Sequence, residues 1–183
     1  MDNIAKDIER VLLSEEEIAA RVAEISADIT RDYGGKNPLL ISVLRGSFIF
    51  MADLVRSLPI ECTLDFMAVS SYGKKSATTG AVKITKDLDL DIEGRHVIIV
   101  EDILDSGLTL SFMMELMSAK RPASIRLCTL LDKPARRQKP IQADYVGFEV
   151  PDEFVVGYGL DYADKYRNLP YIGVLKPCIY CKE

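Results

Sequence analysis

The pattern of apolar and polar residues near the N-terminus predicts a helix. Ser14 and Glu17 have the spacing of a capping box, in which a hydroxyl and a carboxylate each accept a backbone hydrogen bond at the helix start. Apolar residues then recur at helical spacing over residues 18–29, so that they share one face. The glycines at 34–35 and Pro38 end the predicted helix.

Beyond residue 38, short apolar runs alternate with segments of helical spacing. Apolar runs of this length are typical of strands that are buried on both faces of a parallel sheet. Strands are predicted at residues 39–44, 60–71, 82–90, 96–100, 125–131 and 144–150, short strands at 154–157 and 171–175, and helices at 48–57 and 108–119. The alternation predicts an α/β fold with a mostly parallel, twisted sheet flanked by helices.

Two loops of the predicted fold are expected at one edge of the sheet. Ligands of such folds bind beyond the carboxyl ends of the parallel strands. Residues 45–46 and 101–109 directly follow predicted strands, so both segments are expected at the ligand-binding rim. Residues 71–81 are rich in Gly, Ser, Thr and Lys and lack an apolar anchor, which indicates a mobile loop long enough to be a lid.

Composition and charge narrow the class of protein. The 183 residues contain no repeat or linker and fit one domain, residues 1–183. The net charge of −5 argues against broad binding to nucleic acid or to an anionic membrane. Charged residues interrupt every apolar run before it reaches bilayer-spanning length, and the polar N-terminus is unlike a signal peptide. A cytoplasmic location is therefore expected.

The four cysteines and the one histidine predict no metal or redox site. Cys62 and Cys128 lie in strand-like runs and are expected to be packing residues. Cys178 and Cys181 form one C-x-x-C pair, whereas a structural zinc site needs four ligands. His96 opens an apolar strand, so a structural role is expected rather than one in a catalytic triad.

Rival nucleotide and metal motifs fail on single positions. The P-loop pattern is absent. Gly157 and Gly159 begin like a Rossmann fingerprint, but Tyr162 stands where the third glycine is needed. The acids at 87–91 begin like a calcium loop, but Ile92 and Ile98 stand at the glycine and final carboxylate positions. These acids are expected to form a solvated edge or turn.

Three acids and a short phosphate-loop-like segment follow the predicted strand 96–100. Glu101 and Asp102 come first, and vicinal carboxylates suit a vicinal diol and a hard cation such as Mg²⁺. Asp105 comes next, and residues 106–109 lead into the next predicted helix. Glycine lets the backbone approach an anion closely, and free N–H groups at a helix start can hold phosphate. Taken alone, each acid fits a solvated turn, but the combination indicates a ligand.

The stretch Val100–Thr109 resembles the ribose-phosphate signature of the type I phosphoribosyltransferases. Four further stretches resemble one branch of that family, the hypoxanthine (6-oxopurine) phosphoribosyltransferases. They are residues 44–47, 71–72, 131–134 and 154–167. The resemblance covers nearly the whole chain. It implies a small hood over the base site, to which residues 132–183 contribute, and a lid at 71–81.

The resemblance also implies roles for the residues that follow the strand. Glu101 and Asp102 would bind the ribose hydroxyls and Mg²⁺, and Asp161 would lie near a second metal or along the far edge of the base. Asp105 would be the general base near purine N7. The 5′-phosphate would be wrapped by Asp105, Ser106, Gly107, Leu108, Thr109 and Leu110.

Other matching positions would bind pyrophosphate and cover the site. Arg45 and Gly46 would bind pyrophosphate through side-chain charge and backbone N–H, and members of the family often have a cis peptide bond before the residue at position 45. Arg167 would also contact the pyrophosphate. Ser71 and Tyr72 would close over the site with the loop and exclude water.

Three positions would recognise the base. Lys133 would donate to the purine O6, where adenine presents an amino group instead, which would explain selectivity for 6-oxopurines. Phe154 would stack on the base, and the Val155 backbone would lie along its far edge. From the pattern alone, Phe154 and Val155 fit plain core and Lys133 fits a solvated turn, so their family order is what indicates a base site.

Two positions depart from other members of the family. Some members have Lys where this chain has Leu108, so the phosphate loop here must rely on backbone and hydroxyl donors. Arg45 stands where other members have Lys, and little loss is expected because both side chains are cationic.

The implied reaction is transfer of ribose 5-phosphate from phosphoribosyl pyrophosphate to N9 of hypoxanthine and guanine. The products would be IMP or GMP and pyrophosphate, as in purine salvage, and the protein would be a homodimer or homotetramer. Two alternatives remain: an RNA-binding pyrimidine-operon regulator of the same fold, and a transferase for another base such as xanthine or adenine. Asp105 and the net charge argue against the regulator, in which that position is typically aromatic.

Overall fold

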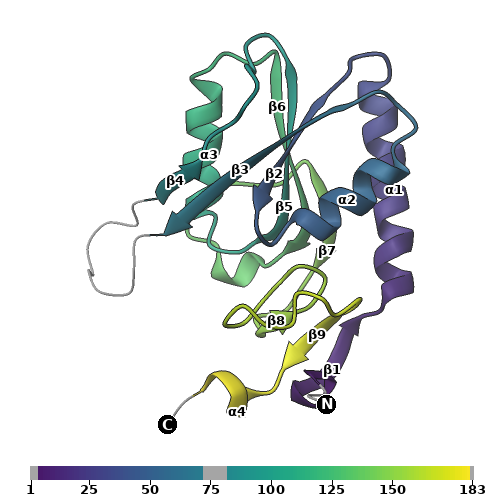
Figure 1. Cartoon of the computed structure of the whole chain (residues 1–183), viewed down its shortest axis with the longest axis vertical. Helices are drawn as coiled ribbons and strands as arrows, with labels where there is room; N and C mark the ends of the chain where they lie inside the picture. The colour runs from purple at the N-terminus through teal and green to yellow at the C-terminus, as the bar shows by residue number, and fades with distance from the viewer. Residues whose placement is uncertain (1–3, 72–81, 182–183) are drawn as a thin grey trace.

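The computed structural model describes residues 4–71 and 82–181, which form a six-stranded and a three-stranded sheet (Figure 1). The larger sheet has the strand order β4-β3-β2-β5-β6-β7. Its strands are β2 (Leu39–Leu44), β3 (Thr63–Ser71), β4 (Val82–Lys86), β5 (His96–Leu104), β6 (Ser124–Asp132) and β7 (Tyr145–Glu149). All neighbouring strands are parallel except β4, which is antiparallel to β3.

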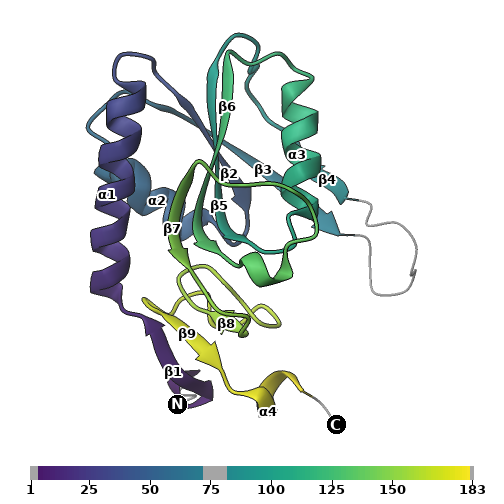
Figure 2. The ribbon, with the colours of Figure 1, turned by 180° about the vertical axis from the view of Figure 1, so that it is seen from behind.

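Helices cover both faces of the larger sheet, as the continuous apolar strands require. The helices α1 (Glu15–Tyr33) and α2 (Phe48–Ser57) lie on one face, and α3 (Leu108–Ser118) lies on the other (Figures 1 and 2). Successive residues of a strand point to opposite faces, so Leu40 joins the core under α1 and α2 while Leu39 and Ile41 join the core under α3. No helix in the described ranges is long and apolar enough to cross a membrane.

The predicted N-terminal helix is α1, and it begins as its sequence indicates. The Ser14 side chain accepts from the Glu17 N–H, and the Glu17 carboxylate accepts from the Ser14 N–H at 2.8 Å. A cap of this kind stabilises a helix by about 1 kcal/mol. The helix buries its apolar stripe, including Ile18, Ile25 and Ile29, against α2 and the sheet.

The smaller sheet is built from both ends of the chain. It has the order β1-β9-β8, with β1 (Ile8–Leu13), β8 (Val155–Val156) and β9 (Ile172–Leu175), and its pairs are antiparallel. Strand β1 was not predicted, because Glu9 and Arg10 interrupt its apolar residues. Its strand conformation is stabilised by pairing with β9, about 160 residues along the chain, which no local pattern reports.

Two predicted strand boundaries were wrong at the sheet edge. Strand β5 does not stop at Val100 but continues to Leu104, because β6 pairs with it as far as Leu104↔Asp132. Glu101 and Asp102 therefore lie within the last part of β5 and not after its end. The predicted strand 82–90 ends at Lys86, because a buried carboxylate accepts hydrogen bonds from the residues that follow.

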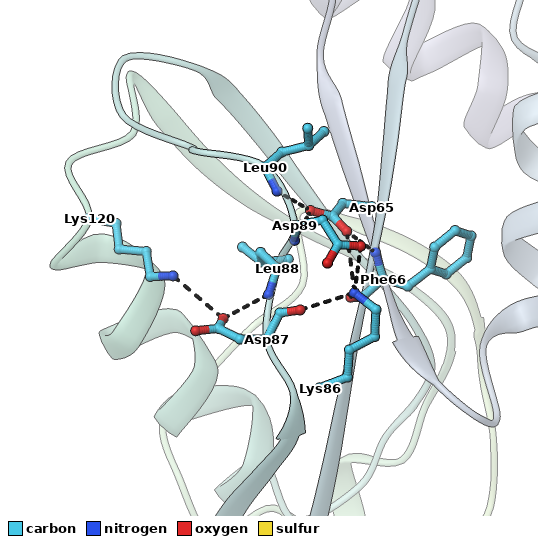
Figure 3. Close-up of polar contacts among 8 residues, drawn as sticks. All are labelled: Asp65, Phe66, Lys86, Asp87, Leu88, Asp89, Leu90 and Lys120. Carbon is cyan, nitrogen blue, oxygen red and sulfur yellow. Dashed lines mark hydrogen bonds and ion pairs between the residues drawn. The ribbon is translucent and has the colours of Figure 1, made fainter.

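Asp65 of β3, which is 3% exposed, ends strand β4 by taking the hydrogen bonds that a longer ladder would need (Figure 3). Its carboxylate accepts from the N–H groups of Asp89 and Leu90, both at 2.9 Å. The Lys86 ammonium binds the Phe66 carbonyl at 3.0 Å and the Asp89 carboxylate at 2.9 Å. The acids at 87–91 thus form a turn, as expected.

Two of the four cysteines and the histidine lie where a packing or structural role is possible. Cys128 is buried and Cys62 half-buried, while Cys178 and Cys181 are exposed, and all four are free thiols. His96 Nδ1 lies 2.8 Å from the Ser124 hydroxyl, and these two residues are the first of β5 and β6. Its position far from the carboxyl end of β5 agrees with the structural role expected.

Candidate active site

A cavity of about 300 Å³ lies at the carboxyl ends of β2 and β5. Eleven of the residues predicted from the sequence line it: Arg45, Gly46, Glu101, Asp102, Asp105, Ser106, Gly107, Thr109, Leu110, Asp161 and Arg167. They come from the loop after β2, the end of β5, the start of α3 and the loop between β8 and β9. The parallel sheet brings these segments to one edge, as the fold class predicts.

The loop after β2 is in direct contact with the acidic end of β5. The peptide bond between Leu44 and Arg45 is cis. A Cβ atom at Gly46 would lie 1.6 Å from Asp102 Oδ2, so glycine is needed for the carboxylate to approach the backbone. A Cβ atom at Gly159 would lie 2.0 Å from the Gly46 carbonyl oxygen, so the loop after β8 presses on the same turn from the other side.

The two carboxylates of β5 are poorly solvated. Burial, and then the charge of Asp102, raise the pKa of Glu101 well above its ordinary value. Burial raises the pKa of Asp102 to about 6, although hydrogen bonds and the charge of Arg167 act in the opposite direction. Glu101 Oε2 and Asp105 Oδ1 are buried with no hydrogen-bond partner among the described residues. Buried oxygens of this kind need a cation or a donor from a ligand.

The segment after Asp105 has the geometry of an anion site at a helix start. Gly107 has a φ of +78°, and α3 begins directly after it. Ser111 N–H donates to the Gly107 carbonyl at 2.9 Å, which is the first bond of the helix. The N–H groups of Thr109 and Leu110 precede that bond and so have no acceptor within the helix. Both residues line the cavity, where these groups can donate to an anion.

The basic residues at the rim are already paired with acids. Arg45 is largely exposed and forms an ion pair with Asp164 at 3.1 Å. Arg167 pairs with Asp161 at 2.6 Å and donates to the Gly159 carbonyl at 2.6 Å. An incoming polyanion would have to share or displace these acids.

A second cavity of about 430 Å³ is also lined by Asp105 and Ser106, together with residues 135–138. Nearby, Lys133 is 4% exposed, and its Nζ donates to the Glu153 carbonyl at 2.8 Å. Burial lowers the pKa of Lys133, and the charge of Asp105 partly opposes this effect. Asp105 therefore stands between the phosphate-loop cavity and the buried lysine.

Val155 belongs to β8 of the small sheet and Phe154 directly precedes it, and neither residue lines the first cavity. Phe154 stacks on Tyr180, with ring centroids 4.8 Å apart, and meets the edge of Tyr162 at 5.4 Å. Val155 is buried and pairs with Val174. One face of the Phe154 ring is thus covered by Tyr180.

Comparison with known sequences decides which family this site belongs to. The profile of the phosphoribosyl transferase domain matches residues 11–163. This chain belongs to the phosphoribosyl transferase family. The match includes the loop after β2, the end of β5 and the start of α3, which are three of the four segments that form the first cavity.

Individual relatives within the family are similar over almost their whole length. A hypoxanthine-guanine phosphoribosyltransferase of Bacillus subtilis is 58% identical over 95% of this chain and 97% of its own. One of Streptococcus thermophilus is 49% identical over 98% of this chain and 99% of its own. The crystal structure of a hypoxanthine phosphoribosyltransferase of Staphylococcus aureus is 48% identical, covers 100% of both chains and superposes with a TM-score of 0.94.

The fold class predicted from the sequence is confirmed by these comparisons and by the sheet itself. The mostly parallel sheet, flanked by helices on both faces, is the type I phosphoribosyltransferase fold. The cis bond before Arg45 also agrees with the family pattern.

Several predicted site residues stand apart from the first cavity. Tyr72 and the rest of the predicted lid, up to residue 81, lie outside the described residues, and so does the side chain of Ser71. Leu108 is exposed at the start of α3. Among the described residues, no three side chains of His, Cys, Asp or Glu are grouped so as to hold a metal ion, and Asp161 pairs with Arg167 instead.

Two residues at the site were not predicted. Gly159 was considered only as part of a failed dinucleotide fingerprint, although its φ of +101° and its contact with Gly46 give it a place at the site. Arg137 was passed over within a basic, proline-flanked stretch that resembles a solvated loop. Besides the Asp132 carboxylate, its partners are backbone carbonyls, and a sequence carries no signal for such contacts.

Proposed function

We propose that this protein transfers the 5-phosphoribosyl group from phosphoribosyl pyrophosphate to N9 of hypoxanthine or guanine. The bond from ribose C1′ to pyrophosphate breaks, and the bond from C1′ to N9 forms, which gives IMP or GMP and pyrophosphate, as in purine salvage. The observation that carries the proposal is the convergence of Glu101, Asp102, Asp105 and the start of α3 on one cavity. It is supported by 58% identity to a hypoxanthine-guanine phosphoribosyltransferase over nearly the whole chain.

The phosphate end of the substrate fits the start of α3. The N–H groups of residues 106–110 and the hydroxyls of Ser106 and Thr109 would donate to the 5′-phosphate, with Gly107 permitting the close approach. Leu108 contributes only its backbone, so the missing lysine of other members leaves no charged donor in this loop. The helix start supplies a partial positive charge in its place.

The pyrophosphate end fits the loop after β2. The backbone of Arg45 and Gly46 and the guanidinium of Arg167 would bind the departing pyrophosphate. Arg167 can bind pyrophosphate by exchanging the Asp161 carboxylate for a phosphate, because a guanidinium can form bidentate hydrogen bonds with either group. Ser71 and Tyr72, with the lid at 71–81, would cover this end and exclude water.

The carboxylates of β5 fit Mg²⁺ and the ribose hydroxyls. Glu101 has a buried, unpartnered oxygen, and burial raises the pKa of both Glu101 and Asp102. A hard divalent cation would stabilise both in their ionised form. Bound there, Mg²⁺ would supply positive charge that stabilises the leaving pyrophosphate. Asp161 would approach a second ion only after it releases Arg167.

The base would be held between Asp105 and the small sheet. Asp105 would accept or share the N7 proton, and its unpartnered Oδ1 leaves an acceptor for it. Lys133 would donate to the purine O6 and would face a donor if adenine were bound. The free face of Phe154 would stack on the base, with the Val155 backbone along the base edge and residues 132–183 contributing the hood.

The alternatives fit these observations less well. An RNA-binding regulator has no use for Asp105 beside a phosphate loop, and the relatives compared above are transferases. A transferase for adenine would leave Lys133 without an acceptor. We expect the enzyme to work as a homodimer or homotetramer in the cytoplasm.

A turnover assay tests the proposal directly. With phosphoribosyl pyrophosphate, Mg²⁺ and one base at a time, IMP and GMP should form from hypoxanthine and guanine, and adenine should give no AMP. Xanthine differs from guanine only at C2 and serves as the measure of selectivity there. Absence of product with every 6-oxopurine would contradict the proposed function.

A further inference from the structure

The loop between β6 and β7 forms hydrogen bonds with the backbone of residues 104–106, the segment that carries Asp105. Lys133 N–H donates to the Leu104 carbonyl at 3.0 Å. Gln138 and Lys139 N–H groups donate to the Ser106 carbonyl at 2.9 and 3.2 Å. Residues 133–139 are therefore hydrogen-bonded along residues 104–106, beyond the end of β6, although neither segment is paired there as a strand.

Arg137 supplies the bonds in the middle of this hydrogen-bonded segment. Its Nε donates to the Asp105 carbonyl at 3.0 Å, and its Nη2 donates to the Leu104 carbonyl at 3.3 Å. Its Nη1 donates to the Ile141 carbonyl at 2.6 Å, within its own loop. The Asp132 carboxylate forms an ion pair with Nη2. The side chain is 17% exposed, so these bonds are shielded from water.

The contact is tight enough to fix the phosphate loop as well. A Cβ atom at Gly107 would lie 2.6 Å from the Ile141 side chain and 3.3 Å from Arg137 Cδ. The carbonyls of Leu104, Asp105 and Ser106 are all occupied by donors of the 133–139 loop. Because a peptide group is planar, holding its carbonyl also sets the direction of the N–H of the next residue.

We propose that Arg137 is a positioning residue for the transfer reaction, acting through the backbone of Asp105 rather than by contact with substrate. By holding the Leu104 and Asp105 carbonyls, it orients the two peptide groups on either side of Asp105, which carry the Asp105 side chain and the Ser106 N–H at the start of the phosphate loop. The inference rests on the proposed function of Asp105 and residues 106–110. It adds the reason why a loop carrying base-recognition residue Lys133 also determines phosphate binding.

The proposed contact of Lys133 with the base does not run through Arg137. The Lys133 ammonium is held by the Glu153 carbonyl, at the edge of the small sheet, and not by any group of Arg137. Loss of Arg137 should therefore affect kcat and the KM for phosphoribosyl pyrophosphate, and should affect the KM for hypoxanthine much less. A general loss of fold would change all three together.

The test compares Arg137→Lys and Arg137→Met with a matched control, Arg21→Lys. Arg21 is also partly buried and also donates to two carbonyls, those of Gly147 at 2.9 Å and Val146 at 2.7 Å, but on β7. Lysine keeps the charge and one donor, whereas methionine keeps only the apolar stem. For each variant, amide hydrogen exchange of residues 104–112, the melting temperature, kcat and both KM values are measured.

In the absence of substrate, we expect Arg137→Lys to increase the hydrogen-exchange rate of the amides of residues 104–112 by about tenfold. Fewer hydrogen bonds would then oppose local opening of this segment. We expect kcat to fall roughly 10- to 100-fold, the usual cost of about 1 Å of misplacement. The KM for phosphoribosyl pyrophosphate should rise several-fold and the KM for hypoxanthine should change by less than about twofold. Arg137→Met should be worse, and Arg21→Lys should lower only the melting temperature.

Two results would overturn the inference. One is unchanged exchange of residues 104–112 in Arg137→Lys; the other is a loss of kcat that follows the melting temperature equally in the Arg137 and Arg21 variants. Should Arg137→Met fail to fold, Arg137→Lys alone decides the matter. Failure of the proposed function is a separate result, because it would appear as absence of IMP and GMP with the unaltered protein, while hydrogen exchange still reports whether Arg137 holds the segment.

Discussion

Asp105 shows how much one side chain depends on its neighbours. It lines both the phosphate-loop cavity and the cavity of residues 135–138, and one of its oxygens is buried with no hydrogen-bond partner among the described residues. Its backbone carbonyl accepts a hydrogen bond from Arg137 Nε at 3.0 Å. These features suit a group that handles a substrate proton.

Replacement of Asp105 tests that role. Asp105→Asn keeps the shape of the side chain but cannot accept a proton, so kcat should fall by roughly 10²- to 10⁴-fold, the usual contribution of a general base. Steady-state kinetics with hypoxanthine would measure it. Asp91→Asn, in the exposed turn after β4, is the control and should keep wild-type turnover. Full turnover in Asp105→Asn would remove the general-base assignment.

Among the described glycines, Gly46 has the least space for a side chain. A Cβ atom there would meet Asp102 Oδ2 at 1.6 Å, so Gly46→Ala must move either the loop after β2 or the carboxylate. We expect a loss of kcat/KM for phosphoribosyl pyrophosphate of roughly 10²-fold, since both groups bind one ligand. Gly94→Ala is the control, because its φ of +69° causes strain but no atom lies within 4 Å. It should cost about 1 kcal/mol of stability and leave the kinetics intact.

At the scale of elements, polar bonds tie helices to the sheet beside the apolar core. The Tyr145 hydroxyl of β7 donates to the Asp32 carboxylate of α1 at 2.7 Å. This bond is the first cause of the lowered pKa of Asp32. It also raises the pKa of Tyr145, together with burial, which has the larger effect.

Tyr145→Phe should therefore destabilise the protein in a pH-dependent way. The lowered pKa of Asp32 means that the folded state binds fewer protons than the unfolded state near pH 4, so the bond stabilises the fold above that pH and this is lost as pH falls. Urea unfolding should show a cost of about 1 kcal/mol at pH 7. The cost should be smaller near pH 3. A cost that is equal at both pH values would show that the Asp32 charge does not contribute.

The base of the β3–β4 hairpin shows why element boundaries were the least predictable feature. The sequence favoured a strand as far as residue 90, because apolar and polar residues alternate there. The buried Asp65 carboxylate instead accepts the N–H groups of Asp89 and Leu90, and the backbone turns away from β3 (Figure 3). A side chain 24 residues earlier thus decides where the strand ends.

At the scale of the whole molecule, binding and stability are linked. The buried carboxylates of Glu101 and Asp102 have raised pKa values, so each is stabilised by a cation when the pH is neutral. A ligand that binds only the folded protein raises its stability by about 2.7 kcal/mol at 100 times its Kd.

Removal of the metal should therefore be visible in the melting temperature. Phosphoribosyl pyrophosphate with Mg²⁺ should raise it by about 5–10 °C at saturating concentrations. Addition of EDTA should remove most of that rise. Asp102→Asn should bind the pair weakly and show little rise with or without EDTA. An equal rise in Asp102→Asn would contradict a metal role for Asp102.

The sequence by itself determined the order of the elements from α1 onward in the larger sheet and the chemistry of the signature. Continuous apolar runs, the capping box at Ser14 and the acids before α3 are local features, and local sterics and burial largely decide their outcome. The apolar runs thus predicted the parallel sheet, and the positions of 45–46 and 101–109 after predicted strands placed both segments at its ligand-binding rim, whereas Asp161 and Arg167 were indicated only by the family resemblance.

Tertiary structure alone decided how those groups are held. The extension of β5 to Leu104, the pairing of β1 with β9, the approach of Asp102 to Gly46 and the bonds of Arg137 all join residues distant in the chain. The raised pKa values of the carboxylates also follow from burial by such neighbours. A one-dimensional pattern records which groups are present, but their energies depend on three-dimensional distances and on exclusion of water.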